Sequence, residues 1–454
     1  MSALIDIRNI SVGFTGRSGA TLPVLRNIDL TVNAGESIGI VGESGSGKST
    51  LALAAMGYLK RGLRLIDGSV AFQGQDMFAR TRTELEQIRG GELALIPQNS
   101  GQSLTPTLRI GAQLIEALRL HADVAQAQYP AKAIELLGQV RLPDPAAIMT
   151  RFPHELSGGQ QQRAAIAMAL AGEPTALLLD EPTTGLDVTT QAHILELLRD
   201  IARDRGMAMV YVSHDLGAIA RVCDRVVVMY AGEVVLEGTA RQVLKAPIHP
   251  YARGLLASIP RLSDPRLPVA LDGRPPAPGG AGQGCSFVDR CALVQDGCRA
   301  SRPGLERLPS GEAVRCFHHQ DAHHLSLTGS GAIPATLVGA AQAALHLEDL
   351  AISYRRPGLF DKLLGRDSAG VPTVDGIEIT VAKGETLGLV GESGSGKSTI
   401  LKAIAGLLPP SGGKITVADG QALATQVEQR SPDHLRKIQL IFQNPDDSLN
   451  PRQT

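Results

Sequence analysis

The stretch GESGSGKST occurs twice in this chain, at Gly42–Thr50 and at Gly391–Thr399. Each copy matches the pattern G-x-x-x-x-G-K-[ST], a glycine-rich loop whose backbone N–H groups surround nucleotide phosphates. The residues before the two loops are also alike, GESIGIV at Gly35–Val41 and GETLGLV at Gly384–Val390. One match could arise by chance, but two matches in the same context make chance a negligible explanation. The chain therefore carries two related nucleotide-binding halves.

The context of the first loop is the one that a phosphate site needs. Glu36–Val41 is an apolar run that predicts a buried strand, and the Leu- and Ala-rich residues 48 to about 59 predict a helix. The N-terminus of this helix would face the phosphates with its unpaired N–H groups and the positive end of its dipole. The second loop is expected to lie between the same two kinds of element.

The loop residues are expected to divide the work of holding MgATP. Lys48 would reach the β- and γ-phosphates, and the Ser49 hydroxyl would hold Mg²⁺. Lys397 and Ser398 have the same places in the second half. The residues expected to bind nucleotide are Gly42, Glu43, Ser44, Gly45, Ser46, Gly47, Lys48, Ser49 and Thr50, and then Gly391, Glu392, Ser393, Gly394, Ser395, Gly396, Lys397, Ser398 and Thr399.

A pair of acidic residues follows a second apolar run. Ala176–Asp180, with the sequence ALLLD, predicts a central parallel strand that is buried on both faces, and Glu181 comes next. Ligands of open α/β sheets bind at the carboxyl ends of the strands, which is where these two acids fall. We expect Asp180 to hold Mg²⁺ through water and Glu181 to polarise the attacking water. The alternative is a pair of helix-capping acids before Pro182.

Between the loop and the acids lies LSGGQ at Leu156–Gln160, followed by Gln, Arg and Ala residues that favour a helix. Ser157 is a good N-cap for that helix. Its N-terminus predicts a second anion site, which one half alone does not need. We therefore expect Ser157, Gly158, Gly159 and Gln160 to cap the nucleotide of the other half.

Together these motifs resemble the ATPase part of an ABC transporter. The first loop, Gln98 after a strand, LSGGQ, LLLDEP, TGLD at Thr184–Asp187 and SHD at Ser213–Asp215 stand in the order of that family. The resemblance covers about Ala3–Pro260 and resumes at about Leu345–Thr454.

Further stretches are similar to one subfamily, the dipeptide, oligopeptide and nickel importer ATPases. They are HELSGGQQQR, EPTTGLDVTTQ, HPYARGLLASIP at His249–Pro260 and GCSFVDRC at Gly284–Cys291. The resemblance implies an α/β fold of P-loop cassettes, each with a RecA-like parallel core sheet, an antiparallel β subdomain and a helical signature subdomain. It implies a first, complete cassette at residues 1–260, a small Cys-rich C-terminal extension at 261–325, a linker at 326–344 and the N-terminal part of a second cassette at 345–454.

The resemblance also implies roles for residues outside the loops. Gln98 and Gln443 would contact Mg²⁺ and water and sense the transmembrane partner. His214 would hydrogen-bond the γ-phosphate, and Asp187 would cross the interface between the halves. The implied catalytic set is Lys48, Gln98, Glu181 and His214, because phosphoryl transfer needs positioning and charge neutralisation more than covalent chemistry.

Two aromatic residues precede the loops on strand-like sequence. The resemblance makes Phe14 and Tyr354 candidates to stack on adenine. For Phe14, the alternative interpretation is an aromatic side chain that packs from a strand into the hydrophobic core. This alternative is nearly as well supported as stacking on adenine.

The second half stops at Thr454, soon after Gln443, and contains no second LSGGQ, Asp-Glu strand or switch histidine. Two explanations stay open: the sequence is truncated, or the second half binds ATP without hydrolysing it. The intact second loop favours truncation. A cassette interrupted at this point would also expose apolar surface of its sheet.

Four of the five cysteines cluster after the Pro- and Gly-rich stretch at Pro260–Gly284. Disulfides do not persist in a reducing cytosol, where such clustering indicates a metal. The spacing contains no C-x-x-C and fits a zinc ribbon poorly. The importer subfamily carries this pattern in its C-terminal extension, so a [4Fe–4S] cluster is favoured over Zn²⁺ or no metal. The expected ligands are Cys285, Cys291, Cys298 and Cys316.

Composition limits the classes of function. The formal net charge is −1, aromatic residues make up 3 % and Trp is absent, so neither a basic field nor a base-stacking surface for nucleic acid is indicated. The N-terminal residues MSALIDIRNISVGF lack a basic leader and an apolar core, and no apolar run is long enough to span a membrane. The sequence predicts a cytoplasmic, soluble chain that reaches a membrane only by docking.

The preferred function is the ATP-hydrolysing subunit of an importer for peptides or related small solutes, at the cytoplasmic face of the membrane. Its expected partners are two transmembrane permease subunits, an extracytoplasmic substrate-binding protein reached through them, and a paired cassette. The docking surface is expected between Leu104 and about Arg151. One alternative is a soluble twin-cassette ATPase that acts on ribosomes or DNA. The other is a regulatory nucleotide binder that does not hydrolyse ATP.

Overall fold

The computed structural model describes residues 3–16, 21–98, 100–260, 268–325, 342–353, 372–418 and 420–442. The chain divides into two compact units, Met1–Ile333 and Pro334–Thr454. The predicted sites at Tyr354 and Gln443 and most of the predicted linker lie outside the described residues.

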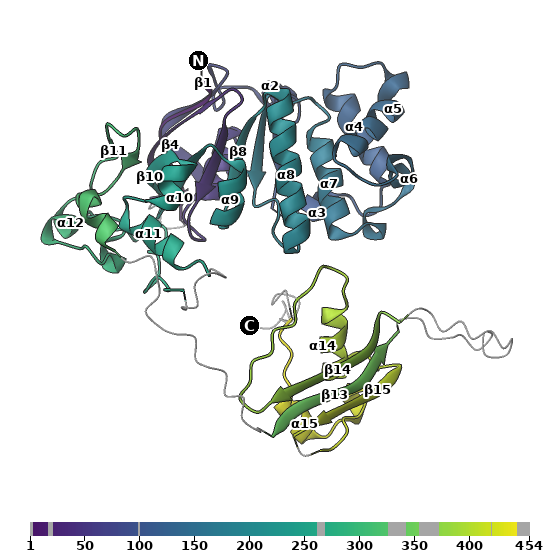
Figure 1. The fold of residues 1–454 in the computed structure, drawn as a ribbon. Helices are drawn as coiled ribbons and strands as arrows, with labels where there is room; N and C mark the ends of the chain where they lie inside the picture. The colour runs from purple at the N-terminus through teal and green to yellow at the C-terminus, as the bar shows by residue number, and fades with distance from the viewer. Residues whose placement is uncertain are drawn as a thin grey trace. The chain divides into compact units, whose positions relative to one another are not determined.

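The centre of the first unit is a mixed sheet of eight strands in the order β11-β12-β10-β9-β3-β8-β7-β6 (Figure 1). The five strands from β9 to β6 run parallel, and β10, β12 and β11 extend one edge in antiparallel pairing. The strands are β3 (Ser37–Val41), β6 (Leu93–Ile96), β7 (Ala176–Asp180), β8 (Ala208–Ser213), β9 (Arg225–Tyr230), β10 (Glu233–Thr239), β11 (Glu306–Arg307) and β12 (Ala313–Val314).

The predicted strands before the loop and before the acids are both confirmed. Every residue of β3 is buried, because β8 and β9 flank it and both faces of the sheet are covered. β7 is buried along its apolar residues, as expected for a continuous apolar run in a parallel sheet.

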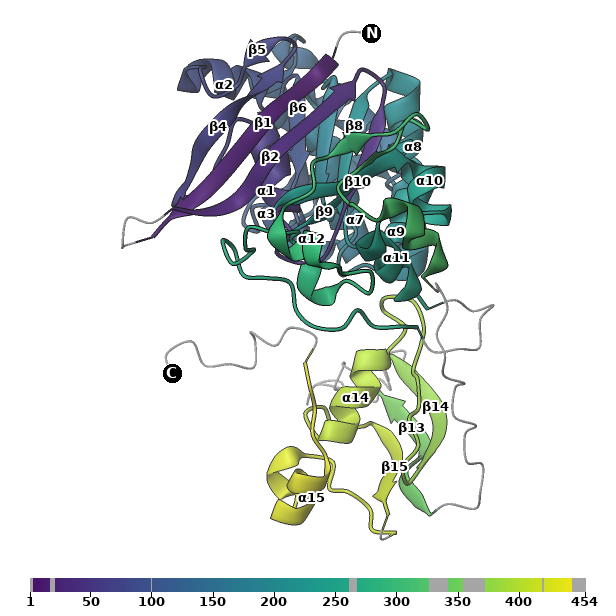
Figure 2. The same ribbon diagram turned by 90° about the vertical axis from the view of Figure 1, so that its left-hand side faces the viewer.

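A second, antiparallel sheet covers one face of this core. It has the order β2-β1-β4-β5, and Figure 2 shows β1, β2 and β4 side by side. The helix α1 (Lys48–Ala55) buries Leu51 and Ala52 in the same apolar cluster as this sheet and the facing side of β3. The strands are β1 (Ala3–Thr15), β2 (Thr21–Asn33), β4 (Leu63–Phe72) and β5 (Gln75–Asp76).

Helices cover the other face of the core sheet and form a helical subdomain around α4, α5 and α6, at the right of Figure 1. The fold class predicted from the sequence is thus confirmed for the first cassette. The helices are α2 (Arg82–Ile88), α3 (Ser100–Ser103), α4 (Ile110–His121), α5 (Tyr129–Gln139), α6 (Pro145–Thr150), α7 (Gly158–Ala169), α8 (Val188–Arg205), α9 (Leu216–Val222), α10 (Ala240–Lys245), α11 (Pro250–Ala257) and α12 (Asp296–Ala300), with short 3₁₀ turns η1 (Gln126–Gln128), η2 (Pro153–Glu155), η3 (Val288–Arg290) and η4 (His319–His324).

The helix after the first loop is shorter than predicted. α1 ends at Ala55 rather than near residue 59. Gly57 has a φ of +67°, and a Cβ there would lie 3.0 Å from the carbonyl oxygen of Met77. The glycine turn ends the helix where the chain must pass close to the strand edge.

The Cys-rich extension is not the separate linker module that the sequence predicts. It adds β12 to the core sheet by pairing Val314 with Leu236 of β10, and it buries Phe287 and Val314 in the same apolar cluster as the helices. The predicted boundary at residue 260 therefore falls inside one compact unit. The extension is a continuation of the first cassette.

The second unit repeats the antiparallel subdomain of the first. β13 pairs with β14 and β15 as β1 pairs with β2 and β4, and α14 follows the second loop. Its elements are β13 (Ala343–Ile352), β14 (Val374–Ala382), β15 (Gly412–Val417), α14 (Lys397–Ala405), α15 (Pro432–Lys437) and the 3₁₀ turn η5 (Val427–Gln429).

The strand expected before the second loop does not form. Residues 385–390 have no strand structure, and the side chains of Val390 and Ile441 are both 90 % exposed. In the first unit the equivalent segment is β3, which owes its order to pairing with β8 and β9. The described part of the second unit contains no counterparts of those two strands. Apolar residues that a paired strand would bury, such as Val390, are exposed instead.

An ion-pair network ties the two sheets of the first unit together. The Arg225 guanidinium donates to Glu36 Oε1 at 2.7 Å, to Glu237 Oε1 at 2.5 Å and to the carbonyl oxygen of Thr31. Burial by itself would raise the pKa of Glu36, but the hydrogen bonds from Arg225 and Asn33 outweigh it and lower this pKa. The network therefore stabilises the charged form of a largely buried carboxylate.

We expect Arg225→Ala to lower the free energy of unfolding of the first unit by about 2–3 kcal/mol, because it leaves largely buried carboxylates without their cation. The pKa of Glu36 is depressed in the folded state, so its contribution is present above its unfolded pKa and lost as pH falls. The stabilities of the two proteins should differ fully above about pH 5, and the difference should shrink as pH falls through the lowered pKa of Glu36.

Arg203→Ala is the matched control, because Arg203 is 70 % exposed and pairs only with surface acids. It should change stability by less than about 0.5 kcal/mol. An equal loss in both variants at all pH values would contradict the structural role given to Arg225.

Candidate nucleotide-binding site

The first glycine-rich loop joins β3 to α1 and depends on glycine at two positions. Gly42 has a φ of +153°, and a Cβ there would lie 2.2 Å from the carbonyl oxygen of Met229. Gly47 has a φ of +99° and caps α1, where a Cβ would lie 2.7 Å from Leu25. The backbone can therefore fold tightly enough to point its N–H groups at an anion.

Lys48 is the first residue of α1 and is buried against the loop. Its Nζ donates to the carbonyl oxygens of Gly42 at 2.8 Å and Glu43 at 2.9 Å. Burial lowers the pKa of Lys48, while the carboxylates of Glu181, Asp180 and Glu43 oppose this shift. The Lys48 ammonium group therefore lies inside the loop, and its contact with phosphates stays a prediction.

The hydroxyl and the carboxylate predicted to hold Mg²⁺ lie together. Ser49 Oγ donates to Asp180 Oδ1 at 2.9 Å, although the two residues are 131 positions apart. Burial raises the pKa of Asp180, and the hydrogen bond from Ser49 opposes that rise. Hydroxyl and carboxylate oxygens are the hard ligands that Mg²⁺ prefers, so this pair fits the ion.

Glu181 is the centre of a cluster that contains two other predicted catalytic residues. Its Oε2 accepts a hydrogen bond from Gln98 Nε2 at 3.0 Å, and its Oε1 lies 3.0 Å from His214 Nδ1. Thr184, the first residue of the TGLD motif, also donates to Oε2 at 3.2 Å, a contact for which the sequence predicted no role. Glu181 has a φ of +48°, a strained conformation for a residue with a side chain.

The helix-capping alternative for the two acids is wrong. The next helix, α8, begins at Val188 and takes Asp187 as its N-cap. Asp180 bonds Ser49, and Glu181 bonds the cluster described above. Both carboxylates face the loop because β7, β8 and β3 end at the same edge of the sheet.

The LSGGQ segment begins a helix as predicted. Ser157 caps α7 by accepting from the N–H of Gln160 at 3.3 Å, and Gln160 Oε1 accepts from the N–H of Ser157 at 3.0 Å. Gly158 and Gly159 are the first two residues of the helix. Ser157 and Gly158 are exposed, so this N-terminus is open to another molecule.

Asp187 is engaged within its own cassette. It accepts from the N–H and the Oγ1 of Thr190, both at 2.9 Å, and from Thr189 Oγ1 at 2.6 Å. A Cβ on Gly159 would lie 2.6 Å from Thr190, so the N-termini of α7 and α8 are adjacent. A role for Asp187 across an interface stays a prediction.

Phe14 is not a core aromatic. It lies near the end of β1 with 44 % of its surface exposed, so the alternative interpretation of Phe14 is wrong. Exposure leaves the ring available for stacking.

The second loop has the same local geometry as the first. Lys397 begins α14, and its Nζ donates to the carbonyl oxygens of Gly391 at 2.8 Å and Glu392 at 2.6 Å. Ser398 is exposed, whereas Ser49 is half-buried and bonded to Asp180. The repeat therefore extends to the lysine and its loop.

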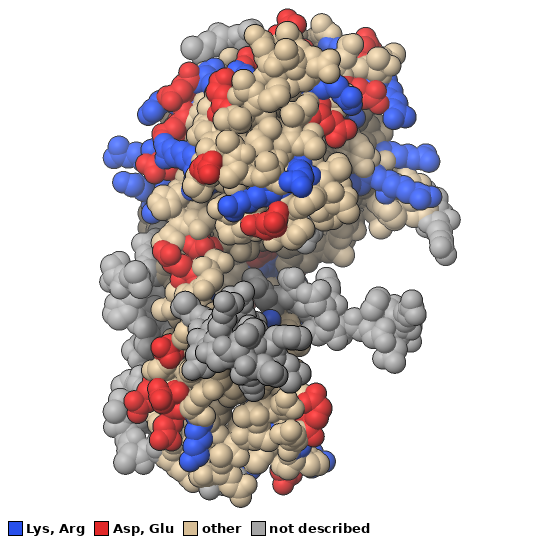
Figure 3. All heavy atoms as spheres, turned by 90° about the vertical axis from the view of Figure 1, so that its right-hand side faces the viewer, with Lys and Arg blue, Asp and Glu red and all other residues tan. Residues whose placement is uncertain are grey.

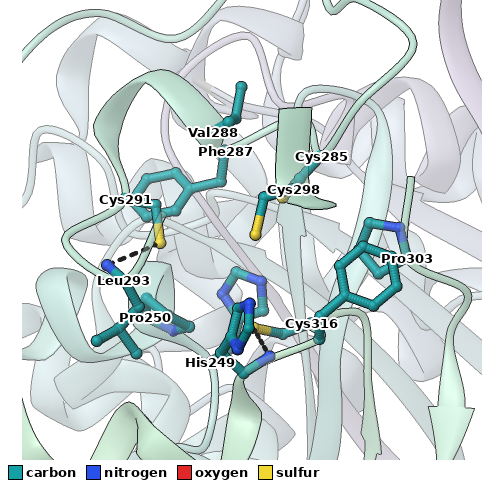
Figure 4. A pocket seen from close by; sticks show the side chains of 12 residues that line it. His249, Pro250, Cys285, Phe287, Val288, Cys291, Leu293, Cys298, Pro303 and Cys316 are labelled. Atoms are coloured by element: carbon teal, nitrogen blue, oxygen red, sulfur yellow. Dashed lines mark hydrogen bonds between the residues drawn. The ribbon is translucent and has the colours of Figure 1, made fainter. Parts of the chain in front are cut away.

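The four clustered cysteines line one small cavity of about 10 Å³ (Figure 4). Burial raises the pKa of Cys291 and of Cys316 to about 11, so these thiols are protonated near neutral pH unless a cation lies beside them. Within the described residues, no three His, Cys, Asp or Glu side chains have an arrangement that could hold a metal ion. The thiols converge as predicted, but the arrangement is not that of a closed metal site.

His249 also lines this cavity and has a structural role. Its Nδ1 accepts from the N–H of Tyr251 at 3.1 Å and so caps α11. Complete burial lowers the pKa of His249 to about 4, so the ring is neutral at physiological pH. His249 is the first residue of the HPYARGLLASIP stretch, and its capping role depends on contacts that the motif alone does not reveal.

Two family models match the chain. The model described as ABC transporter matches residues 25–184 and 374–454, slightly more than half of the chain. The model described as Oligopeptide/dipeptide transporter, C-terminal region, matches residues 236–298, which include α11 and three of the clustered cysteines.

Curated relatives match over nearly the whole chain. The chain is 37 % identical over 462 residues to the Oligopeptide transport ATP-binding protein OppD of Mycobacterium bovis, covering 100 % of this chain and 74 % of that protein. It is 34 % identical over 457 residues to the Glutathione import ATP-binding protein GsiA of Shigella dysenteriae, covering 99 % of this chain and 66 % of that protein. A solved dimer of a bacterial ABC transporter cassette is 29 % identical, with a TM-score of 0.47, and covers 52 % of this chain.

We expect Glu181→Gln to retain MgATP but to lose about 100-fold or more of the turnover at its site, because the amide cannot polarise the attacking water. Steady-state ATPase rates and equilibrium nucleotide binding, measured on the same preparation, separate the two effects. Glu173→Gln is the control, since Glu173 is an exposed acid in the same unit that pairs with Lys132. Undiminished hydrolysis by Glu181→Gln would refute the role of this carboxylate.

Proposed function

The chain belongs to the ABC transporter family of ATPases, and from this premise we propose that it energises an importer of di- or oligopeptides. One observation carries the proposal. The Glu181 cluster and a segment that matches the oligopeptide/dipeptide transporter C-terminal region lie in the same compact unit. The printed names of the relatives, which specify oligopeptide transport and glutathione import, support the same class of cargo.

The proposed hydrolytic face is built from the residues around the first loop. The loop N–H groups and Lys48 bind the phosphates, and Ser49, Asp180 and Gln98 hold Mg²⁺, which neutralises charge on the phosphates when bound. Glu181 polarises the attacking water, and His214 steadies the γ-phosphate. The direct contacts of Glu181 with Gln98 and His214 support this arrangement.

The exposed N-terminus of α7 is proposed to complete the site of an opposing cassette. Ser157, Gly158 and Gly159 would then place backbone N–H groups against a nucleotide held by another loop. Asp187 would lie at the same interface. The second loop, with Lys397, would bind a further nucleotide in the same way as the first.

A groove in the first unit is proposed to receive a permease subunit. It has a volume of about 410 Å³ and lies where the end of β6 meets α4 and α7. Pro97, the neighbour of Gln98, lines it, and so does Leu120, whose surface is 65 % exposed. Part of the groove belongs to the predicted docking region and the rest adjoins it. A permease segment docked there would lie next to Gln98, a proposed Mg²⁺ ligand.

The proposed location is the cytoplasmic face of the membrane, reached through the permease. Among the described residues, no helix combines the length and the apolarity needed to cross a bilayer. On the face drawn in Figure 3, Lys and Arg are interspersed with Asp and Glu. Together with the net charge of −1, this mixture gives no support to the alternative of a nucleic-acid or ribosome partner.

We expect Leu120→Arg to abolish docking while leaving basal ATPase activity intact, because a charge replaces an apolar contact in the groove. The ATPase rate stimulated by the reconstituted permease, and peptide uptake, should fall about tenfold or more. Val269→Arg is the control, a partly exposed apolar residue of the extension that lies outside both the groove and the predicted docking region. Stimulation that survives Leu120→Arg would contradict the docking role of the groove. No stimulation of the wild type by a permease would contradict the importer role.

We further propose that the four cysteines bind a metal centre, a [4Fe–4S] cluster before Zn²⁺. The support is the chemistry of the donors: four thiols reach one cavity whose other lining is mainly apolar, as Figure 4 shows. As they stand, no three of the described side chains could hold a metal ion, so binding requires the thiols to rearrange. A bound metal would deprotonate the thiols and hold the extension to the core.

We expect protein purified without oxygen to contain about four iron atoms per chain, or about one zinc, and Cys291→Ser to lose that metal. Elemental analysis with an absorbance spectrum measures both outcomes. Cys223→Ser is the control, because Cys223 is buried far along the chain from the cluster and does not line its cavity. Absence of both iron and zinc would contradict the proposal that the four cysteines are metal ligands.

A further inference from the structure

We propose that Arg290 and Tyr251 are positioning residues for the first phosphate loop, so that the Cys-rich extension sets the affinity of that loop for MgATP. This inference rests on the proposed function, because it takes the loop at Gly42–Thr50 as a nucleotide site. It gives a role to one residue of the HPYARGLLASIP stretch and one of the GCSFVDRC stretch, and it gives the extension a direct part in nucleotide binding.

Arg290 holds the side chain of Glu43, the second residue of the loop. Its Nη1 donates to Glu43 Oε2 at 2.7 Å and its Nη2 donates to Glu43 Oε1 at 2.9 Å. The Arg290 side chain is only 4 % exposed, so this pair is largely shielded from water. A two-point contact between planar groups fixes the orientation of the carboxylate as well as its distance.

Arg290 is itself held rigidly by its surroundings. Its Nε donates to the carbonyl oxygen of Asp272 at 2.8 Å, and its Nη1 is 3.3 Å from the hydroxyl of Tyr230. The guanidinium also lies 5.7 Å from the ring centroid of Tyr230 and 5.9 Å from that of Phe287. The position of Glu43 is therefore determined by the extension and not by the loop alone.

Tyr251 holds the backbone of the same residue. The N–H of Glu43 donates to the Tyr251 hydroxyl at 2.8 Å, and the Tyr251 ring is completely buried. The ring packs 4.6 Å from Tyr230 and 5.4 Å from Phe287, between centroids, and the His249 cap fixes the start of its helix. A single buried aromatic cluster thus carries both contacts to Glu43.

The third polar group of Glu43 contacts the lysine that meets the phosphates. The carbonyl oxygen of Glu43 accepts from Lys48 Nζ at 2.9 Å and from the N–H of Ser46 at 3.2 Å. A displacement of Glu43 therefore changes the place of the ammonium group and the closure of the loop. Holding the loop in one conformation before binding reduces the ordering cost when the nucleotide arrives.

The test uses the full chain with Lys397→Ala as background, so that only the first loop binds nucleotide. Tyr251→Phe removes one hydroxyl, and Arg290→Gln removes the two-point contact. Each should raise the Kd for a fluorescent MgATP analogue about tenfold, the effect of losing a charge-assisted or buried hydrogen bond, while kcat changes much less. Arg290→Lys, which keeps one charged contact, should recover part of the affinity.

Arg299→Gln is the matched control, an exposed arginine of the same extension whose ion partner is also on the surface. A double-mutant cycle between Arg290→Gln and Glu43→Gln should show that the two effects on Kd are not additive. If Arg290→Gln fails to fold, Tyr251→Phe decides the outcome by itself.

Two results would overturn the inference and are distinct from failure of the proposed function. One is a lowered melting temperature with an unchanged Kd, which would make both residues merely structural. The other is additivity in the cycle. If instead the background protein retains no MgATP, or Lys48→Ala does not reduce its binding, the proposed nucleotide site fails first.

Discussion

The parallel pairing of β3, β8 and β7 is the constraint on which the site depends. The register aligns Val41 with Ser213 and Asp180 with Val212, so three strands end at one edge of the sheet. The loop after β3, the acids after β7 and the histidine after β8 therefore meet, although they are far apart in sequence. The second unit shows the converse: without such neighbours in its described part, the segment before its loop forms no strand.

The site is also held from outside the cassette motifs. The extension enters the core sheet through β12 and reaches the loop through the contacts made to Glu43. The Cys-rich extension, predicted as a separate module, thus lies in the same apolar cluster as the helices of the core. Loss of order in the extension would change the conformation of the phosphate loop, since buried polar contacts link the two segments directly.

Local patterns predicted the local features well. The strand at β3, the strand at β7 and the Ser157 cap are confirmed, because each depends on a short run of neighbouring residues. The predicted length of α1 was wrong. The helix ends before the turn at Gly57, where the backbone passes close to Met77, and the periodicity of the sequence does not reveal this contact. The sequence left open whether Asp180 and Glu181 cap a helix. Their contacts with Ser49 and His214, which are distant in sequence, exclude this alternative.

The sequence by itself determined that two P-loop halves are present and which family they belong to, because glycine loops, caps and buried strands depend on nearest neighbours in the chain. Tertiary structure alone decided that Thr184 joins the Glu181 cluster, that four cysteines share one cavity, and that Arg290 and Tyr251 hold Glu43. These contacts join residues as many as 247 positions apart, and only the packing of the sheet edges and the aromatic cluster sets such distances.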